Sequence, residues 1–289
     1  MTARTTDVPI DGGDLRVAVW GPDDPAAPTA LLVHGITASH ISWQAVARAL
    51  PDVRLIAPDL RGRGRSNELP PGEGMAAHAA DLVRVLDHLD VARTVVAGHS
   101  MGAFVSLVLA HQHPGRVSRL VLVDGGLPLR VPEGITAEQV SALVLGPAAE
   151  RLAMTFASPS AYLEYWREHP ALAECWGPDV EAYLAYDLVP AGAELRPSTS
   201  LEVMRADIAD LYEGPTAAEA LAALAHPAHL ITVPRGLMND LPGLYAEEYL
   251  AELLPEHPRI EHTRLADGNH YSVLLDETLA DEVARLIRG

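Results

Sequence analysis

The stretch that decides the fold runs from residue 94 to residue 111 and reads TVVAGHSMGAFVSLVLAH. It begins with the short apolar run of a buried strand and ends with the longer apolar run of a buried helix. Between them, Gly98-His99-Ser100-Met101-Gly102 places a serine in a Gly-x-Ser-x-Gly turn. Such a sharp turn requires small flanking residues, and the first N–H groups of the helix are free to bind an oxyanion. We therefore predict that Ser100 is a nucleophile at the carboxyl end of a strand.

The same alternation of short apolar runs and longer helical patterns extends on both sides of this turn. It is typical of repeated βαβ units, so the predicted fold class is α/β with a mostly parallel sheet flanked by helices. We expect strands at 15–20, 30–33, 53–57, 94–97, 120–123, 229–233 and 260–265. We expect helices at 42–50, 75–89, 103–111, 244–254 and 272–288.

The pattern changes after residue 126, where β-branched runs disappear and alanine, leucine and glutamate recur at helical spacing. Ser158 before Pro159 predicts a helix N-cap, and Thr216 with Glu219 predicts a capping box. We therefore expect a core made of residues 1–126 and 227–289, with an all-helical insert at 127–226.

The composition excludes several chemistries. The chain has 289 residues and a formal charge of −18, and all of its 21 basic residues are arginine. A P-loop and a Schiff-base enzyme both need a lysine, so neither fits. A nucleic-acid partner is not expected, because such partners are bound by basic clusters that this acidic chain lacks.

Other cofactor and compartment signals are equally weak. The single cysteine, Cys175, excludes an intramolecular disulfide and a cysteine-based zinc cluster. Gly62-Arg63-Gly64 lacks the third glycine of a dinucleotide fingerprint, and His111 with His113 has no metal-site companion nearby. No leader or membrane-spanning stretch is evident. We therefore expect no cofactor, no metal and no membrane partner, in a cytoplasmic protein.

A serine nucleophile needs a base and a carboxylate that orients the base. His270 follows the last expected strand and precedes the last expected helix, at the sheet edge where Ser100 is expected, so we predict that it is the base. Two aspartates satisfy the order serine, acid, histidine. Asp124 ends the strand at 120–123, and Asp240 lies in the loop after the strand at 229–233.

Four motifs in this order resemble the α/β-hydrolase family: His34-Gly35, the loop 59–64 (DLRGRG), the turn 98–102 (GHSMG) and Asn269-His270. The resemblance covers nearly the whole chain. It implies an eight-stranded mixed sheet with a helical cap inserted after the sixth strand, and a Ser-acid-His triad in that chain order.

The resemblance also implies roles for the residues around the nucleophile. Gly35 would make room for the oxyanion loop, and the backbone N–H groups of Ile36 and Met101 would form the oxyanion hole. His34 would brace that loop without acting in catalysis. The series Arg61, Arg63 and Arg65 would anchor a structural loop.

The family comparison bears on the acid. Most relatives place it after the later strand, where this chain has the amide of Asn239, with Asp240 one residue further. An amide cannot stabilise the imidazolium that forms when histidine takes the proton. Some lactonases and dehalogenases of the family use the earlier position. We favour Asp124, with Asp240 as the alternative.

Several aromatic side chains are candidates to line a substrate pocket. Tyr162 and Trp166 share one face of an expected insert helix, and Tyr186 lies on another. Gly35, which begins the predicted oxyanion loop, and Trp43, which follows it, are also expected to line the pocket. Such faces either grip an apolar substrate or merely pack the insert onto the core.

These features predict a cofactor-independent serine hydrolase that opens a small apolar ester or lactone through an acyl-enzyme on Ser100. A thioesterase or a carbon–carbon bond hydrolase would use the same triad. Haloalkane dehalogenases and epoxide hydrolases have aspartate at the position of Ser100 and are disfavoured. The alternative from another class is a ligand receptor or scaffold that keeps the fold without useful turnover.

Overall fold

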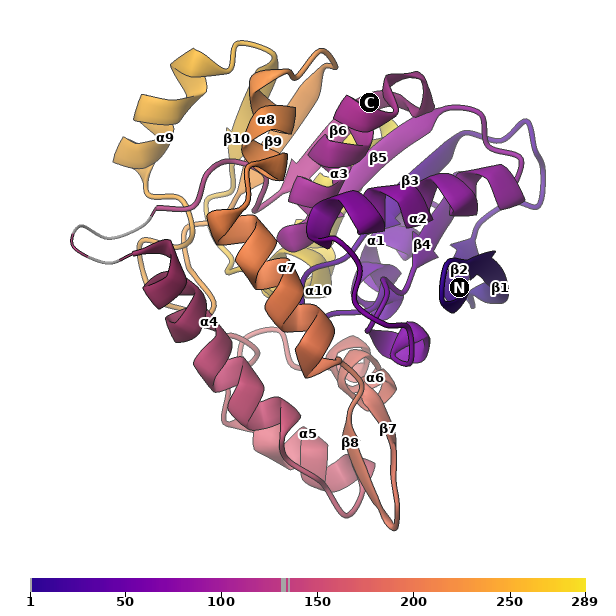
Figure 1. Ribbon diagram of the computed structural model, residues 1–289, viewed down its shortest axis with the longest axis vertical. Coiled ribbons are helices and arrows are strands. Elements are labelled where there is room, and N and C mark those ends of the chain that lie inside the picture. The colour runs from indigo at the N-terminus through magenta and orange to yellow at the C-terminus, as the bar shows by residue number, and fades with distance from the viewer. Residues whose placement is uncertain (1, 131–133, 135) are drawn as a thin grey trace.

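The computed structural model describes residues 2–130, 134 and 136–289, and its centre is one eight-stranded sheet. The strand order is β1-β2-β4-β3-β5-β6-β9-β10 (Figure 1). Neighbours from β4 to β10 run parallel, and β2 runs antiparallel to β1 and β4. The strands are β1 (Arg4–Ile10), β2 (Gly13–Trp20), β3 (Thr29–Val33), β4 (Arg54–Pro58), β5 (Thr94–His99), β6 (Val117–Val123), β9 (Ala228–Thr232) and β10 (Ile260–Arg264). The predicted mixed, mostly parallel sheet is confirmed.

Strand β1 was not predicted from the sequence. Its residues RTTDVPI are mostly polar and exposed, and Val8 is its one buried side chain. It pairs along its whole length with β2, from Arg4 opposite Val19 to Ile10 opposite Gly13. An edge strand with one solvated face carries little of the hydrophobic signal that marks a buried strand.

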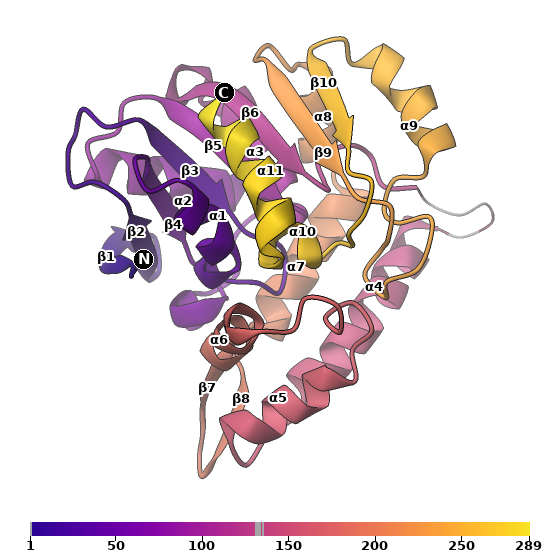
Figure 2. The same ribbon diagram turned by 180° about the vertical axis from the view of Figure 1, so that it is seen from behind.

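Helices cover both faces of the sheet, as two hydrophobic clusters show. In β3, Leu31 and Val33 point into the cluster under α2 and α3, whereas Leu32 points into the cluster under α1 and α11. Figures 1 and 2 show these two layers from opposite sides. Both faces are therefore buried, as in other parallel sheets. The helices are α1 (Gln44–Ala49), α2 (Gly74–His88), α3 (Met101–Gln112), α8 (Thr216–Ala222), α9 (Glu247–Leu253), α10 (Ser272–Leu275) and α11 (Glu277–Arg288).

The expected insert follows β6 and is mainly helical, but it also contains a hairpin that the sequence did not predict. Its strands pair antiparallel around Gly192, which has a φ of 65°. Four-residue strands are too short to give a readable β pattern. The elements are α4 (Ala137–Leu152), α5 (Pro159–Arg167), α6 (Pro178–Tyr186), β7 (Leu188–Ala191), β8 (Glu194–Pro197) and α7 (Leu201–Glu213).

One of the two predicted helix caps is present. The Ser158 side chain accepts a hydrogen bond from the N–H of Ala161 and caps α5. The capping box predicted at Thr216 is wrong, because Thr216 is already helical and its hydroxyl donates to Asp210 instead. Helix α8, which starts there, packs against α3 of the core.

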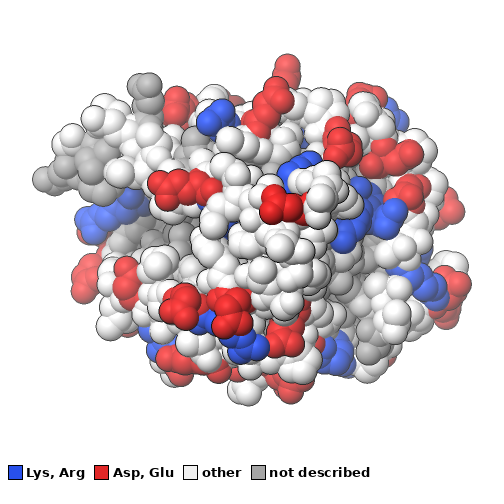
Figure 3. All heavy atoms as spheres, turned by 90° about the horizontal axis from the view of Figure 1, so that it is seen from below, with Lys and Arg blue, Asp and Glu red and all other residues white. Residues whose placement is uncertain are grey.

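Charged side chains are distributed around the surface. On the face at the insert end of the molecule, acidic and basic side chains are interspersed around an uncharged area (Figure 3). Within the described part of the chain, no helix is both long enough and apolar enough to cross a membrane.

Candidate active site

Ser100 occupies the strained turn between β5 and α3. Its φ of 55° and ψ of −125° lie in a region of backbone conformation that residues other than glycine rarely adopt. Its N–H donates to the carbonyl oxygen of Val123 in β6 at 2.9 Å. A Cβ atom at Gly98 would overlap the carbonyl oxygen of Gly102, and one at Gly102 would overlap that of Val33. The small flanking residues predicted for this turn are therefore required by backbone packing. The turn presents Ser100 at the N-terminus of α3.

His270 lies beside Asp124, one of the two acids left open by the sequence. Nδ1 of the imidazole donates to Oδ2 of the carboxylate at 2.6 Å, and both side chains are buried. Asp124 follows β6 with a φ of 44°, and its N–H donates to Ile231 in β9 at 2.8 Å, so two strands fix its position. In the described part of the chain no hydrogen bond joins the Ser100 hydroxyl to His270, although both line one cavity. Contacts of this kind often tighten only when substrate binds.

Asp240 lies away from the imidazole. It is exposed, and its backbone oxygen accepts a hydrogen bond from the N–H of Gly236. The neighbouring Asn239 holds the loop instead: its Oδ1 accepts from Nε of Arg235 at 2.7 Å and from Nδ2 of Asn269 at 3.0 Å. The amide at this position therefore joins two loops, and the geometry places Asp124 in contact with His270, the predicted base.

The structure adds His99, which the sequence reasoning did not assign. Its Nε2–H donates to the backbone oxygen of His270 at 2.9 Å, and the two rings lie 4.7 Å apart. Burial, with a smaller contribution from His270, holds the pKa of His99 well below its usual value, so the ring is neutral. His99, the variable residue of the Gly-x-Ser motif, thus supports the loop that carries His270. Its place directly before Ser100 was the one signal in the sequence that could have identified His99.

The predicted oxyanion elements converge at the same turn. A Cβ atom on Gly35 would lie 3.1 Å from Cβ of Ser100, so a side chain there would crowd the nucleophile. Nε2 of His34 accepts from the N–H of Leu60 at 2.9 Å, which leaves Nδ1–H to donate to the carbonyl oxygen of Gly35 at 2.8 Å. Because the two ends of a trans peptide point in opposite directions, this bond orients the N–H of Ile36.

The neutral state of His34 follows from its surroundings. Burial lowers its pKa to about 4, against the opposing charge of Asp59. Only the neutral ring can accept from one backbone group and donate to another. This agrees with the bracing role that the family resemblance implied.

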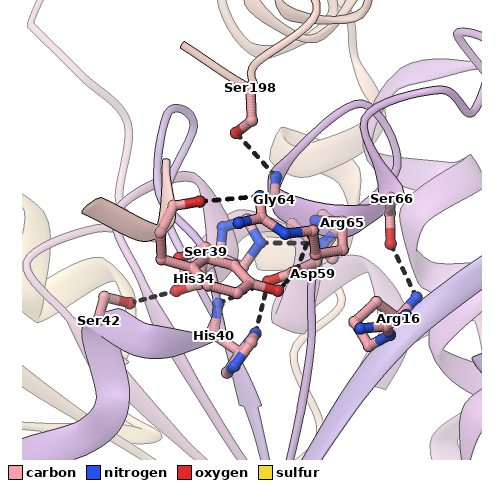
Figure 4. A network of polar contacts seen from close by, with 12 residues as sticks. Arg16, His34, Ser39, His40, Ser42, Asp59, Gly64, Arg65, Ser66 and Ser198 are labelled. Carbon is pink, nitrogen blue, oxygen red and sulfur yellow. Dashed lines mark hydrogen bonds and ion pairs between the residues drawn. The ribbon is translucent and has the colours of Figure 1, made fainter. Parts of the chain in front are cut away.

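Asp59 connects the oxyanion loop to the insert (Figure 4). Its Oδ1 accepts from the backbone N–H and Nδ1 of His40, and its Oδ2 accepts from the N–H of Arg65 and the hydroxyl of Tyr186. Burial opposes its ionisation, but the hydrogen bond and charge of His40 outweigh burial and lower the pKa to about 2. One carboxylate therefore joins the segment after β3, the loop after β4 and helix α6.

The three loop arginines act as anchors, as predicted. Arg61 donates to both oxygens of Asp81 at 2.8 and 2.9 Å. Arg65 donates to the backbone oxygen of Tyr186 and lies over its ring. Arg63 is fully buried among protein groups.

A cavity of about 110 Å³ opens above Ser100 between the sheet and the insert. Its walls are mainly apolar, and the insert contributes Ile208 and Leu211 of α7. Three tyrosines, Tyr183, Tyr212 and Tyr271, add aromatic surface with hydroxyl groups. Its further lining includes Gly35, Ile36, Met101, Phe104, Leu129, Leu237, Leu244 and Leu274.

Four of the five expected lining residues lie elsewhere, so the structure corrects that expectation for Trp43, Tyr162, Trp166 and Tyr186. Trp43 is fully buried in the hydrophobic cluster under α1 and α11. The other three hold the insert together or attach it to the core. These aromatic faces have the packing role that the sequence had left as one of two alternatives.

The insert contacts of these tyrosines are specific. Tyr162 donates to Asp187 and accepts from Arg151, each at 2.6 Å, and its ring packs edge-on against Trp166. Tyr186 binds Asp59 at 2.7 Å through its hydroxyl.

Two other features of the described chain bear on the site: the thiol of Cys175 and the residue types that commonly bind metals. Burial raises the pKa of the Cys175 thiol to about 11, which makes it a poor nucleophile at neutral pH. Among the residues that the structure describes, no group of three or more histidine, cysteine, aspartate or glutamate side chains could hold a metal ion.

Residues 28–191 match the family described as the alpha/beta hydrolase fold, and the chain belongs to this family. It is 30% identical over 276 residues to a 3-hydroxybutyrate-oligomer hydrolase of Cupriavidus necator, covering 89% of this chain and 87% of that protein. It is 38% identical over 141 residues to lipase LipV of Mycobacterium tuberculosis. That match covers 48% of this chain and only about half, 53%, of LipV.

Solved structures share the fold over the whole chain. An E-2-(acetamidomethylene)succinate hydrolase has a TM-score of 0.80 at 21% identity, with all of both chains covered. An esterase of Thermogutta terrifontis has a TM-score of 0.68 at 22% identity, covering 100% of this chain and 98% of that one. At these identities the likeness concerns the fold alone.

Proposed function

We propose that this chain is a cofactor-independent serine hydrolase that cleaves a carboxylic ester through an acyl-enzyme on Ser100. The observation that carries the proposal is the buried 2.6 Å contact between His270 and Asp124 at the cavity that Ser100 lines. A base oriented by a carboxylate beside a strained serine is the arrangement that activates a hydroxyl nucleophile.

In the first half of the reaction, Nε2 of His270 takes the proton of the Ser100 hydroxyl as the oxygen attacks the ester carbonyl. Asp124 holds the Nδ1 proton and stabilises the imidazolium. The negative charge moves to the carbonyl oxygen, which accepts hydrogen bonds from the N–H groups of Ile36 and Met101. The tetrahedral intermediate then expels the alcohol, which takes the proton back from His270.

In the second half, a water molecule gives its proton to His270 and attacks the acyl carbonyl. The same two N–H groups hold the second oxyanion. Collapse of this intermediate returns the proton to the oxygen of Ser100 and releases the carboxylic acid. No lysine and no cofactor takes part in either half.

The lining favours a short acyl chain that is mostly apolar but carries a polar group. Leu129, Ile208 and Leu211 offer apolar walls, and Tyr183 and Tyr271, which also line the cavity, each carry a hydroxyl group. The Cupriavidus relative is named for hydrolysis of 3-hydroxybutyrate oligomers. We therefore place short linear hydroxyacyl esters first among candidate substrates. Lactones, which are internal esters, come second.

The test is a panel of nitrophenyl esters of increasing chain length, hydroxyacyl ester dimers, lactones and thioesters, compared by kcat/KM. The expected result is turnover of short esters, abolished in Ser100→Ala, together with labelling of Ser100 by a fluorophosphonate. If the purified protein neither turns over any ester nor takes the label, the proposal is wrong. Binding of the same esters without turnover would then indicate a receptor or scaffold. Thioesters turned over well above esters would indicate a thioesterase.

A further inference from the structure

Arg63 is a charged side chain that is fully buried and whose role the proposed reaction leaves unexplained. It follows β4 in the loop 59–66, behind the oxyanion turn, and its side chain is 0% exposed. Burying a guanidinium is costly unless every donor is used and a counterion is present. The partners of Arg63 therefore indicate what the charge is for.

Arg63 contacts both residues assigned to the oxyanion hole. Its Nε donates to the backbone oxygen of Ile36 at 2.8 Å, and its Nη2 lies 3.9 Å from Sδ of Met101. The carbonyl before Ile36 is held by His34, and the carbonyl after it by Arg63. The two peptides that flank Ile36 are thus held from both sides, which fixes the direction of its N–H.

The counterion of Arg63 comes from the insert. Asp207 of α7 is buried, and its Oδ2 lies 2.5 Å from Nη1 of Arg63. Its Oδ1 contacts Nε2 of His78 in α2 at 3.0 Å. Burial opposes ionisation of Asp207, but the charges of Arg63 and His78 outweigh it and lower the pKa to about 2, so the carboxylate is charged.

The helix that carries Asp207 also lines the cavity. Ile208 is the next residue along α7, and Leu211 follows one turn later. A substrate that contacts these side chains therefore contacts the helix whose carboxylate orients Arg63. Because Arg63 contacts both Asp207 of α7 and the backbone of Ile36, the position of α7 and the direction of the Ile36 N–H are coupled.

We propose that Arg63 and Asp207 are a positioning pair through which helix α7 aligns the oxyanion hole. The proposal rests on the serine-hydrolase function proposed above. The pair touches no reacting atom. It acts on Ile36 and Met101, so its effect falls on the tetrahedral intermediate, in which the oxyanion hole is used, rather than on the bound ester.

The test compares three variants of the full-length protein. Asp207→Asn removes the counterion, and Arg63→Lys keeps the charge but cannot reproduce the planar fork of donors. Asp210→Asn is the matched control. Asp210 lies on the same helix and anchors it by accepting from the N–H of Met75 at 2.7 Å, and its partners are Met75 and Thr216 rather than the oxyanion loop.

Loss of a full oxyanion donor costs about 100- to 1000-fold in rate, so a misaligned donor is expected to cost about 10- to 100-fold. Asp207→Asn and Arg63→Lys should lower kcat by that factor with KM changed by less than about threefold. Affinity for a boronic acid that mimics the tetrahedral intermediate should fall in parallel. Asp210→Asn should lower the melting temperature but leave kcat within about twofold.

Asp207→Asn leaves the guanidinium buried without its counterion and can prevent folding. A double variant, Arg63→Met with Asp207→Leu, replaces the pair by apolar groups of similar volume, an exchange that folded proteins often tolerate. It should show the same loss of kcat. Its kcat therefore tests the proposal if Asp207→Asn does not fold.

The inference is overturned if the folded variants keep kcat and boronate affinity within about twofold of the wild type. It is also overturned if Asp210→Asn loses as much kcat as Asp207→Asn, because helix docking alone would then explain the effect. A wild-type protein that turns over no ester would instead remove the proposed function itself. The two failures are thus distinguishable.

Discussion

Replacement of Asp124 by asparagine tests the central geometry of the site. The carboxylate lies 2.6 Å from Nδ1 of His270, and both side chains are buried. Asparagine has nearly the same shape, so the fold and the cavity should survive. What the substitution removes is the negative charge, together with an acceptor for the Nδ1 proton.

The expected loss follows from that charge. Two unit charges about 4 Å apart at an effective dielectric constant of about 20 attract each other by about 4 kcal/mol, which corresponds to about 1000-fold in rate. An asparagine NH₂ group would also donate a hydrogen bond to Nδ1, which forces the ring proton onto Nε2. A protonated Nε2 cannot accept the proton of Ser100. We therefore expect kcat to fall by about 1000- to 10,000-fold, with little change in KM.

The assay is steady-state hydrolysis of a short nitrophenyl ester by wild-type protein, Asp124→Asn and Asp240→Asn, with circular dichroism to verify folding. Asp240→Asn serves as the control, because Asp240 is exposed and lies outside the triad contact. A kcat for Asp124→Asn above about a tenth of the wild-type value would refute the reasoning. So would a loss in Asp240→Asn comparable to that in Asp124→Asn.

Three further predictions concern residues around the triad. His99→Phe keeps the ring but removes the donor to the backbone of His270, and we expect kcat to fall about tenfold because the base is less well positioned, measured with the same ester. Tyr186→Phe leaves one oxygen of the buried Asp59 without its hydroxyl partner, and we expect a loss of about 1.5–3 kcal/mol in the free energy of unfolding by urea, with kcat nearly unchanged. Burial lowers the pKa of His34 from about 6.5, the value of an unperturbed histidine, to about 4 in the folded chain, so the unfolded chain binds the proton first as the pH falls. Stability should therefore decline by about 3 kcal/mol between pH 6.5 and 4, and His34→Gln should remove that part of the pH dependence in urea titrations.

Much of the fold could be read from local sequence patterns. Parallel strands buried on both faces give continuous apolar runs, and β3 to β6 and β9 were expected on that ground. The edge strand β10 was also expected, although Ile260 is its one buried residue. The helices between these strands were expected from their longer patterns of apolar residues at helical spacing. Strand β1 and the hairpin of β7 and β8 were not, because an exposed edge strand and four-residue strands bury too few side chains to leave a pattern.

The lining of the cavity could not be read in this way. Aromatic residues at helical spacing show that a helix has a buried face, but not whether that face meets a cavity or a neighbouring helix. Tyr162 and Trp166 meet their neighbours within the insert, whereas Tyr183 and Tyr212 line the cavity. The direction in which each helix face points is set by how the insert packs on the core.

The sequence by itself determined the Gly-x-Ser-x-Gly turn at Ser100, the run of buried parallel strands and the place of His270 after the last strand. Each follows from steric or hydrophobic requirements within a few neighbouring residues. Only the tertiary structure placed Asp124 beside His270, across 146 residues of chain, and Asp207 beside Arg63. Such contacts depend on where separate strands and helices bring their side chains together, and no local pattern encodes that meeting.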